Sequence, residues 1–234
     1  MNQALIFDYG GTLDTDGRHW AHVLWEGYRK AEVPVTNEQF REAYVYGERA
    51  LAKAPIVLPE DTFREVLEKK VVQQFACLKD AEIWTVADVV QAEKQRIIVD
   101  YCHDYALRHI RVAQRVLAVL RQKYRMVLVS NFYGNIEAIL RYFGLAEYFD
   151  AVIESAVVGV RKPDPEIYRL GVKATGCDAA NVTVIGDSYS KDIVPANTIG
   201  CRTIWLRGEG WGSDDAGSLA DVEITALSDV LQYL

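Results

Sequence analysis

Short apolar runs that each end in polar residues constrain the fold of this 234-residue chain more than any other feature. The three clearest runs, with the residues that follow them, are Ala4–Phe7 before Asp8, Met126–Val129 before Ser130-Asn131, and Val182–Ile185 before Gly186-Asp187. Weaker runs lie at Ala151–Ile153 and Thr203–Leu206. Continuous apolar runs of this length are typical of strands buried on both faces, which predicts a parallel sheet covered on both sides.

Amphipathic patterns between these runs predict helices. The two patterns are Ile136, Ile139, Leu140 and Phe143, with Gly144 placed to end the helix, and Val112, Val116, Val119 and Leu120, just before the second strand. Strands that alternate with helices of this length predict an α/β fold in which a Rossmann-like parallel sheet lies between two helical layers.

One connection is too long for a simple crossover between parallel strands. About a hundred residues separate the first apolar run from the second, although a crossover needs only a dozen or more. This interval has helix-favouring stretches at Glu60–Phe75 and Val86–Leu107 and few strand patterns. We therefore predict a core of residues 1–14 and 107–234 and an α-helical cap inserted at residues 15–106.

Composition narrows the class of partner. The chain has 26 Lys and Arg against 33 Asp and Glu, a net charge of −7, which argues against a nucleic-acid partner. It shows no signal peptide and no apolar stretch long enough to span a membrane, so we expect a cytoplasmic protein. No CxxC pair occurs among Cys77, Cys102, Cys177 and Cys201, which predicts reduced, buried thiols.

Polar side chains at the carboxyl ends of the predicted strands suggest the site, because ligands of open parallel sheets bind there. These residues are Asp8, Ser130-Asn131 and Asp187, to which the loop Gly159–Pro165 adds Lys162. A pair of carboxylates suits Mg²⁺, and a hydroxyl and an ammonium suit phosphate oxygens. A carboxylate that attacks a phosphoryl group needs such cations to overcome the repulsion between anions.

The segments that carry these residues resemble the motifs of the haloacid dehalogenase-like (HAD) hydrolase superfamily. In family order they are Phe7–Leu13 (Phe-Asp-Tyr-Gly-Gly-Thr-Leu), Val129–Asn131, Arg161–Pro165 (Arg-Lys-Pro-Asp-Pro) and Gly186–Ile193. The predicted insertion is similar to the helical cap of the branch that contains phosphoglucomutases and dehalogenases. The resemblance implies a Mg²⁺-dependent hydrolase, most simply a phosphatase that acts on a small phosphorylated metabolite through an aspartyl-phosphate.

The resemblance also implies roles for individual residues. Asp8 would be the nucleophile, and Lys162 would neutralise charge on Asp8 and on the phosphoryl group. Ser130 would hydrogen-bond that group, helped by the backbone N–H of Asn131. The implied metal ligands are Asp8, Asp187 and the carbonyl of Gly10. Asp192 would either bind the metal through water or orient Lys162.

The chain departs from the family phosphatases at Gly10. Those enzymes carry at this position a second Asp that serves as general acid and base, and glycine has no side chain to move a proton. Since such catalysis typically contributes about 10²–10⁴-fold, we expect a slow phosphatase unless another group substitutes. Candidates for that substitution are Asp14, Asp16 and His19.

Two other functions remain open. The change at Gly10 also suits a catalytically silent homologue that binds a phosphorylated ligand or a protein. The second alternative is cleavage of a C–halogen or C–P bond, because the dehalogenase and phosphonatase branches also lack an acid at the position of Gly10. Dehalogenases usually replace the residue equivalent to Asp187, which favours phosphoryl chemistry here. Phosphonatases usually use a cap lysine, for which Lys30 and Lys53 are available.

Two further patterns have weaker functional interpretations. His19 and His22 lie close together on a predicted helix, but no third ligand accompanies them, so we interpret them as surface or core residues. The run Gly208–Gly212 is similar to a dinucleotide loop only in its glycines, because no helix pattern follows it.

Overall fold

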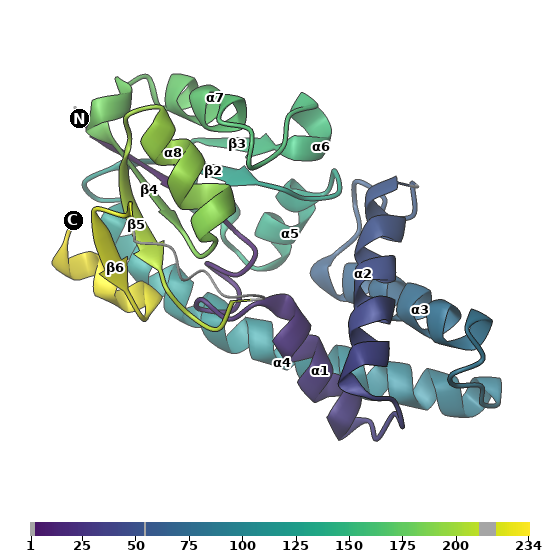
Figure 1. The fold of residues 1–234 in the computed structure, drawn as a ribbon. Coiled ribbons are helices and arrows are strands. Elements are labelled where there is room, and N and C mark those ends of the chain that lie inside the picture. The colour runs from purple at the N-terminus through teal and green to yellow at the C-terminus, as the bar shows by residue number, and fades with distance from the viewer. Residues whose placement is uncertain (1–2, 54, 211–218) are drawn as a thin grey trace.

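The computed structural model describes residues 3–53, 55–210 and 219–234, and its centre is a six-stranded sheet of parallel strands (Figure 1). The strands are β1 (Ala4–Phe7), β2 (Arg125–Ser130), β3 (Ala151–Glu154), β4 (Val182–Gly186), β5 (Arg202–Leu206) and β6 (Val222–Ile224). Their order, β3-β2-β1-β4-β5-β6, is that of Rossmann-like folds. The fold class and the expected strands are confirmed, while β6 was not predicted because its pattern is only three residues long.

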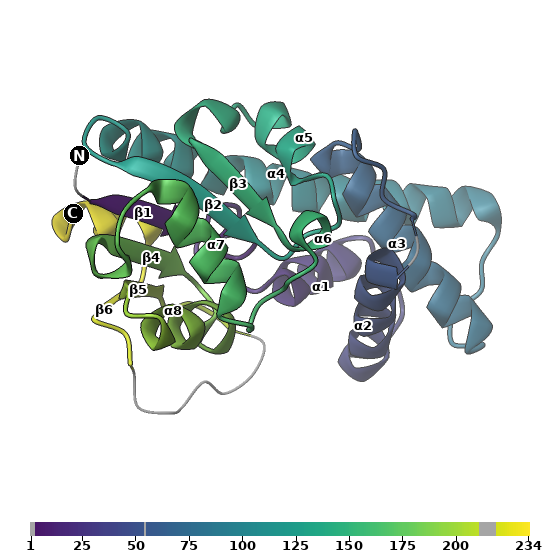
Figure 2. The ribbon, with the colours of Figure 1, turned by 90° about the horizontal axis from the view of Figure 1, so that it is seen from above.

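Four helices fill the interval between β1 and β2. The first three lie to one side of the sheet, and the fourth extends from them along one face of the sheet (Figure 1, Figure 2). They are α1 (Trp20–Lys30), α2 (Asn37–Lys53), α3 (Phe63–Asp80) and α4 (Asp88–Leu120). The later helices are α5 (Ile136–Tyr142), α6 (Ser155–Val158), α7 (Glu166–Thr175) and α8 (Val194–Thr198), with shorter turns η1 (Ala146–Tyr148), η2 (Ala179–Asn181), η3 (Tyr189–Ile193) and η4 (Leu227–Gln232). The predicted α-helical insertion is therefore confirmed.

The two faces of the sheet have separate apolar cores. Leu5 and Phe7 of β1 point into a core that also receives buried side chains of α4, α5 and η4. Ala4 and Ile6, which alternate with them, point into a second core formed with α7 and α8. This alternation follows from the two-residue repeat of a strand and produces the expected three layers.

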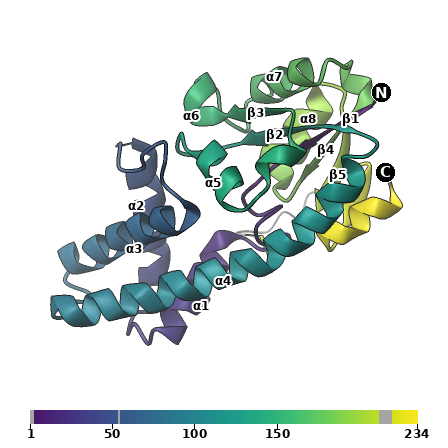
Figure 3. The ribbon, with the colours of Figure 1, turned by 180° about the vertical axis from the view of Figure 1, so that it is seen from behind.

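Helix α4 differs from the prediction. The sequence predicts one helix over Val86–Leu107 and another that contains Val112 and Leu120, but a single helix of 33 residues spans both (Figure 3). Its first half packs against α1 and α3, and its last turns reach the core under the sheet. One uninterrupted helix can serve both environments because its buried stripe continues from Ile98 to Leu120. The division at residues 106 and 107 falls within α4 and stays a prediction.

Two expectations from composition can be compared with the structure. All four cysteines are free thiols, with Cys102 and Cys201 buried and Cys77 and Cys177 half-buried. Among the described residues, no helix combines the length and the apolar character needed to cross a bilayer.

The packing of α4 leads to a test of the insertion. Ile98 is completely buried where α4 meets Gly27 of α1, so Ile98→Ala should lower the free energy of unfolding by about 2–5 kcal/mol. Val89→Ala on the same helix is the matched control, because Val89 is 77% exposed and its truncation should cost less than about 0.5 kcal/mol. Urea denaturation measures both values, and equal values would contradict this packing.

Candidate active site

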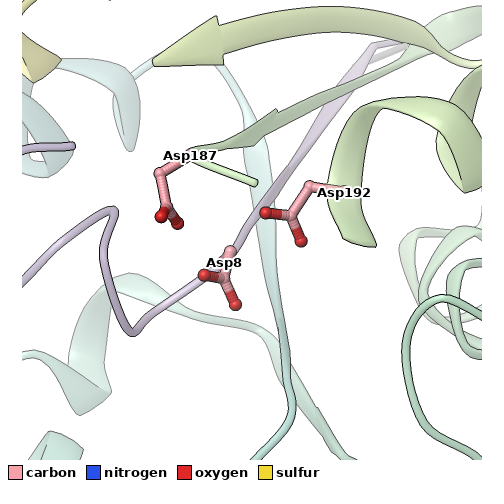
Figure 4. Close-up of side chains that lie close together, drawn as sticks. All are labelled: Asp8, Asp187 and Asp192. Carbon is pink, nitrogen blue, oxygen red and sulfur yellow. The ribbon is translucent and has the colours of Figure 1, made fainter. Parts of the chain in front are cut away.

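The carboxylates of Asp8 and Asp187 meet where the strand order of the sheet reverses. Asp8 follows β1 and Asp187 follows β4, and these strands are neighbours, with the Asp8 N–H donating to the Ile185 carbonyl at 3.0 Å. Asp192 joins them from η3, and the three carboxylates face one another (Figure 4). One oxygen of each lies within 4.8 Å of the others. Predicted from separate motifs, the three acids form one cluster.

The Lys162 side chain balances part of this negative charge. Its Nζ lies 2.5 Å from Asp8 Oδ1 and 2.7 Å from Asp192 Oδ1, and the residue is only 4% exposed. Burial alone lowers the pKa of Lys162, but the Asp192 and Asp8 carboxylates outweigh it, so the pKa lies above its ordinary value. Lys162 therefore stays charged beside Asp8.

Both carboxylate oxygens of Asp192 accept hydrogen bonds from other groups of the protein. Oδ1 accepts from Lys162 and from the Tyr168 hydroxyl at 2.7 Å, and Oδ2 accepts from the Ser188 N–H at 2.9 Å. The Lys162 contact agrees with the role in which Asp192 orients that lysine, and metal binding through water stays a prediction.

A tight turn brings Asp187 against the backbone of the first motif. Thr12 Oγ1 donates to Asp187 Oδ1 at 3.0 Å, and Gly11 has a φ of +98°. A Cβ atom at Gly11 would overlap the Asp187 carboxylate, so the turn requires glycine for both its conformation and its space.

The acidic cluster is electrostatically strained without a further cation. Burial raises the pKa of Asp8 to about 6, although Lys162 opposes the shift. Burial and the Asp8 and Asp192 carboxylates raise the pKa of Asp187 well above its usual range. Oxygen ligands of this kind are those that Mg²⁺ prefers, so the residues present fit a divalent cation.

The residues of the second motif lie on the other side of Asp8. Ser130 is buried at the end of β2 and lines the same cavity as Asp8. The Asn131 side chain accepts from the Lys162 N–H at 2.9 Å and donates to the Lys162 carbonyl at 3.1 Å. The amide of Asn131 therefore anchors the loop that carries Lys162, a role that the sequence does not reveal.

The cavity has a volume of about 450 Å³ and lies between the sheet edge and the inserted helices. Every predicted site residue lines it: Asp8, Gly10, Ser130, Asn131, Lys162, Asp187 and Asp192. A cavity of this size suits a small metabolite.

The three candidates for the missing proton carrier lie in different places. Asp14 is buried in the cavity wall, where its carboxylate accepts from the Gly11 N–H at 2.8 Å and from Trp20 Nε1 at 2.9 Å. Burial raises the pKa of Asp14 to about 7. Asp16 instead accepts from the Leu227 N–H at 2.6 Å and does not line the cavity.

His19 lines the cavity but does not lie within a helix as predicted. It is the N-cap of α1, and its Nδ1 accepts from the Ala21 N–H at 3.2 Å. Burial, reinforced by Lys191, lowers the pKa of His19 to about 4, so the ring is neutral at physiological pH.

Neither of the two weaker patterns contributes to the metal-type cluster found in the part of the chain that the structure describes. Nε2 of His22 pairs with the Gly210 carbonyl at 2.9 Å, and the metal-type cluster found among the described residues is the Asp8 group. Gly208–Gly210 form a loop beside the cavity, whereas Trp211 and Gly212 lie outside the described residues.

Sequence reasoning missed the side chains that the insertion contributes to the cavity. Besides Trp20 and apolar side chains of α3, they include Tyr44 and Glu48 of α2 and Lys70 of α3, whereas the suggested Lys30 and Lys53 do not line the cavity. A usable signal existed for Lys70, because it follows Val66 and Leu67 at helical spacing on the buried face of α3.

The raised pKa values predict how stability depends on pH. Between about pH 4 and pH 7 the folded protein retains a proton on Asp14 that the unfolded chain loses near its pKa of 3.8, and the raised pKa of Asp187 acts in the same direction. Without divalent cations, the free energy of unfolding should therefore fall as pH rises through this window. Mg²⁺ should raise the melting temperature more at pH 8 than at pH 6.5, because protons compete less for the carboxylates.

Thermal melts with and without Mg²⁺ measure both effects. Asp187→Asn should remove most of the Mg²⁺-dependent shift, while Asp221→Asn, whose carboxylate binds Thr203 away from the cavity, should retain it. A full shift in Asp187→Asn would show that the cation binds elsewhere.

Comparison with known proteins supports the same conclusions about the fold. The glyceraldehyde 3-phosphate phosphatase of Pyrococcus abyssi is 35% identical over 106 residues, 43% of either chain. The (S)-2-haloacid dehalogenase of Pseudomonas sp. is 28% identical over 113 residues, 48% of either chain. The chain thus spans about half the length of these curated relatives.

A solved structure extends the likeness to the whole chain. YfnB of Bacillus subtilis, described as a HAD-hydrolase bound to magnesium, has a TM-score of 0.63 at 20% identity, with 99% of this chain and 98% of that one covered. At this identity the likeness shows the fold. A model of the haloacid dehalogenase-like hydrolase family matches residues 3–200, on both sides of the inserted helices, and the chain therefore belongs to that family.

Proposed function

We propose that the chain is a Mg²⁺-dependent phosphatase that hydrolyses small phosphorylated metabolites through an aspartyl-phosphate on Asp8. The observation that carries this proposal is the contact of Lys162 with Asp8 inside an acidic cluster suited to a divalent cation. The phosphatase name of the Pyrococcus relative agrees with it. Residues 15–106 would form the cap that excludes water from the cavity and sets specificity.

The residues present can carry both half-reactions. An Asp8 oxygen attacks phosphorus while the ester P–O bond breaks, and the leaving oxygen takes a proton from an acid. Water then attacks the phosphorus, releases phosphate and returns Asp8 to its carboxylate, while its proton passes to a base. Lys162 and Ser130 stabilise charge on the phosphoryl oxygens, and bound Mg²⁺, held by Asp8, Asp187 and the Gly10 carbonyl, would add positive charge there.

C–X cleavage is supported less well than phosphoryl transfer. Dehalogenases of the family usually replace the residue equivalent to Asp187. Here the Asp187 carboxylate is present in the acidic cluster and accepts a hydrogen bond from Thr12. A phosphonatase-type Schiff base needs a neutral amine, but the Glu48 carboxylate outweighs the effect of burial and keeps the pKa of Lys70 above its ordinary value. The geometry therefore favours phosphate esters over halides and phosphonates.

The nucleophile and the missing acid can be tested together. Asp8→Asn should abolish Mg²⁺-dependent turnover, because an amide does not attack phosphorus. Gly10→Asp should raise kcat, by up to about 10²–10⁴-fold, since it restores the general acid. The new side chain has room, because a Cβ atom at Gly10 meets no other atom within 4 Å.

A panel of phosphate esters with and without Mg²⁺ measures these rates. No turnover in the wild type and in Gly10→Asp would overturn the phosphatase proposal and favour a silent binding protein. Halide release from 2-haloacids without metal would favour a dehalogenase.

We further propose that Asp14 carries the proton in place of the missing acid, because it is the candidate acid that lines the cavity. Asp14→Ala should then lower kcat roughly tenfold or more in the wild type. The same change should cost less than about threefold in the Gly10→Asp background, where a second acid is available.

The pH profile is an independent readout of this role. With Asp14 as the acid, the wild-type kcat should fall as pH rises above the Asp14 pKa of about 7. Equal losses from Asp14→Ala in both backgrounds would show that Asp14 is structural.

A further inference from the structure

A buried lysine lies in the part of the cavity that the inserted helices form. Lys70 of α3 is 8% exposed and lines the same cavity as Asp8, Ser130 and Lys162. Burial of an ammonium costs free energy unless an anionic group lies beside it. The anionic and polar groups around Lys70 therefore indicate which kind of ligand it can bind.

The counter-charge of Lys70 is Glu48, and a residue of the core holds Glu48 in place. Lys70 Nζ lies 2.6 Å from Glu48 Oε1, and Glu48 Oε2 accepts from the Tyr133 hydroxyl at 2.7 Å. The Tyr133 ring centroid is also 5.7 Å from Nζ. Three segments, α2, α3 and the loop after β2, therefore position one ammonium.

The ammonium keeps capacity for a ligand. It carries three N–H groups, and among the described residues Glu48 is the acidic partner within ion-pair distance. Lys70 is nearly fully buried and lines the cavity, where an oxyanion of the substrate would accept from the ammonium beside Glu48. His19, which lines the same cavity, is neutral and adds no competing charge.

The chemistry of that oxyanion follows from what the rest of the cavity provides. Lys162 and Ser130 serve the phosphoryl group, and the other cations that line the cavity, Arg161 and Lys191, come from core loops. Lys70 is the cation that the inserted helices add, with a single positive charge. A carboxylate matches that charge, and its two oxygens match the remaining N–H groups. The cavity volume of about 450 Å³ limits the carbon chain between the two anions to a few atoms.

We propose that Lys70 binds the carboxylate of a small phosphorylated hydroxy acid while Asp8 and Lys162 engage its phosphoryl group. This inference rests on the proposed phosphatase function and names its substrate class. Glu48 and Tyr133 are positioning residues, because they act on the substrate through Lys70.

Three esters with one carbon skeleton test the proposal. 3-Phosphoglycerate, glycerol 3-phosphate and glyceraldehyde 3-phosphate differ only in a carboxylate, an alcohol and an aldehyde at the far end. The wild type should prefer the carboxylate by roughly tenfold to a hundredfold in kcat/KM, the range expected for a hydrogen bond to a charged group. The gain should lie mainly in KM, since Lys70 does not contact the reacting atoms.

Variants separate recognition from folding. Lys70→Met alone leaves the Glu48 charge buried, so the decisive variant is Lys70→Met with Glu48→Gln, which removes both charges together. It should lose the carboxylate preference, and a thermal melt checks that it folds. Lys79→Met is the matched control on α3, because Lys79 is exposed and lies outside the cavity, and it should keep the preference.

The possible failures are distinguishable. Absence of p-nitrophenyl phosphate hydrolysis in the wild type would count against the phosphatase function alone, and calorimetry would then decide the present inference. Asp8→Asn, which binds without turnover, should bind 3-phosphoglycerate at least about tenfold more tightly than glycerol 3-phosphate. Equal affinities, or a preference that survives in the double variant, would overturn the role of Lys70.

Discussion

The site depends on the ammonium of Lys162, which lies between the carboxylates of Asp8 and Asp192. Three segments far apart in the sequence meet at this one group, and all three side chains are more than nine-tenths buried. Removal of one partner from such an arrangement leaves an uncompensated buried charge and typically costs about 3–5 kcal/mol. The surrounding hydrogen bonds, from Tyr168 to Asp192 and from Asn131 to the Lys162 backbone, keep the ammonium in place.

Lys162 neutralises only part of the negative charge of the acidic cluster, and burial of the excess explains the raised pKa values in the site. With Asp187 added, three carboxylates face one ammonium in a buried environment, and the pKa values of Asp8 and Asp187 rise accordingly. Such an excess of buried negative charge is unfavourable unless a cation offsets it. The net charge of −7 is therefore a poor guide to the local field of the cavity.

The inserted helices supply a second, separate ion pair, Lys70 with Glu48. The Tyr133 hydroxyl connects this pair to the core, and the Asn135 side chain makes a similar link to the Asp61 carbonyl at 2.9 Å. The cavity thus has a cluster of charged groups at the sheet edge and an ion pair on the helices. A ligand with two anionic ends would contact both, which couples substrate recognition to the position of the insertion.

The amino-acid sequence is enough to predict the sheet, the helical insertion and the acidic residues at the strand ends. Buried strands are continuous apolar runs, and the carboxyl ends of neighbouring parallel strands must meet at one edge. The sequence also shows that position 10 has no side chain. Packing in three dimensions makes α4 one helix, brings Asp14 but not Asp16 to the cavity, and places Lys70 at the site instead of Lys30 or Lys53. These outcomes depend on which face of a helix or turn meets a partner distant in the sequence, and local spacing contains no information about that partner.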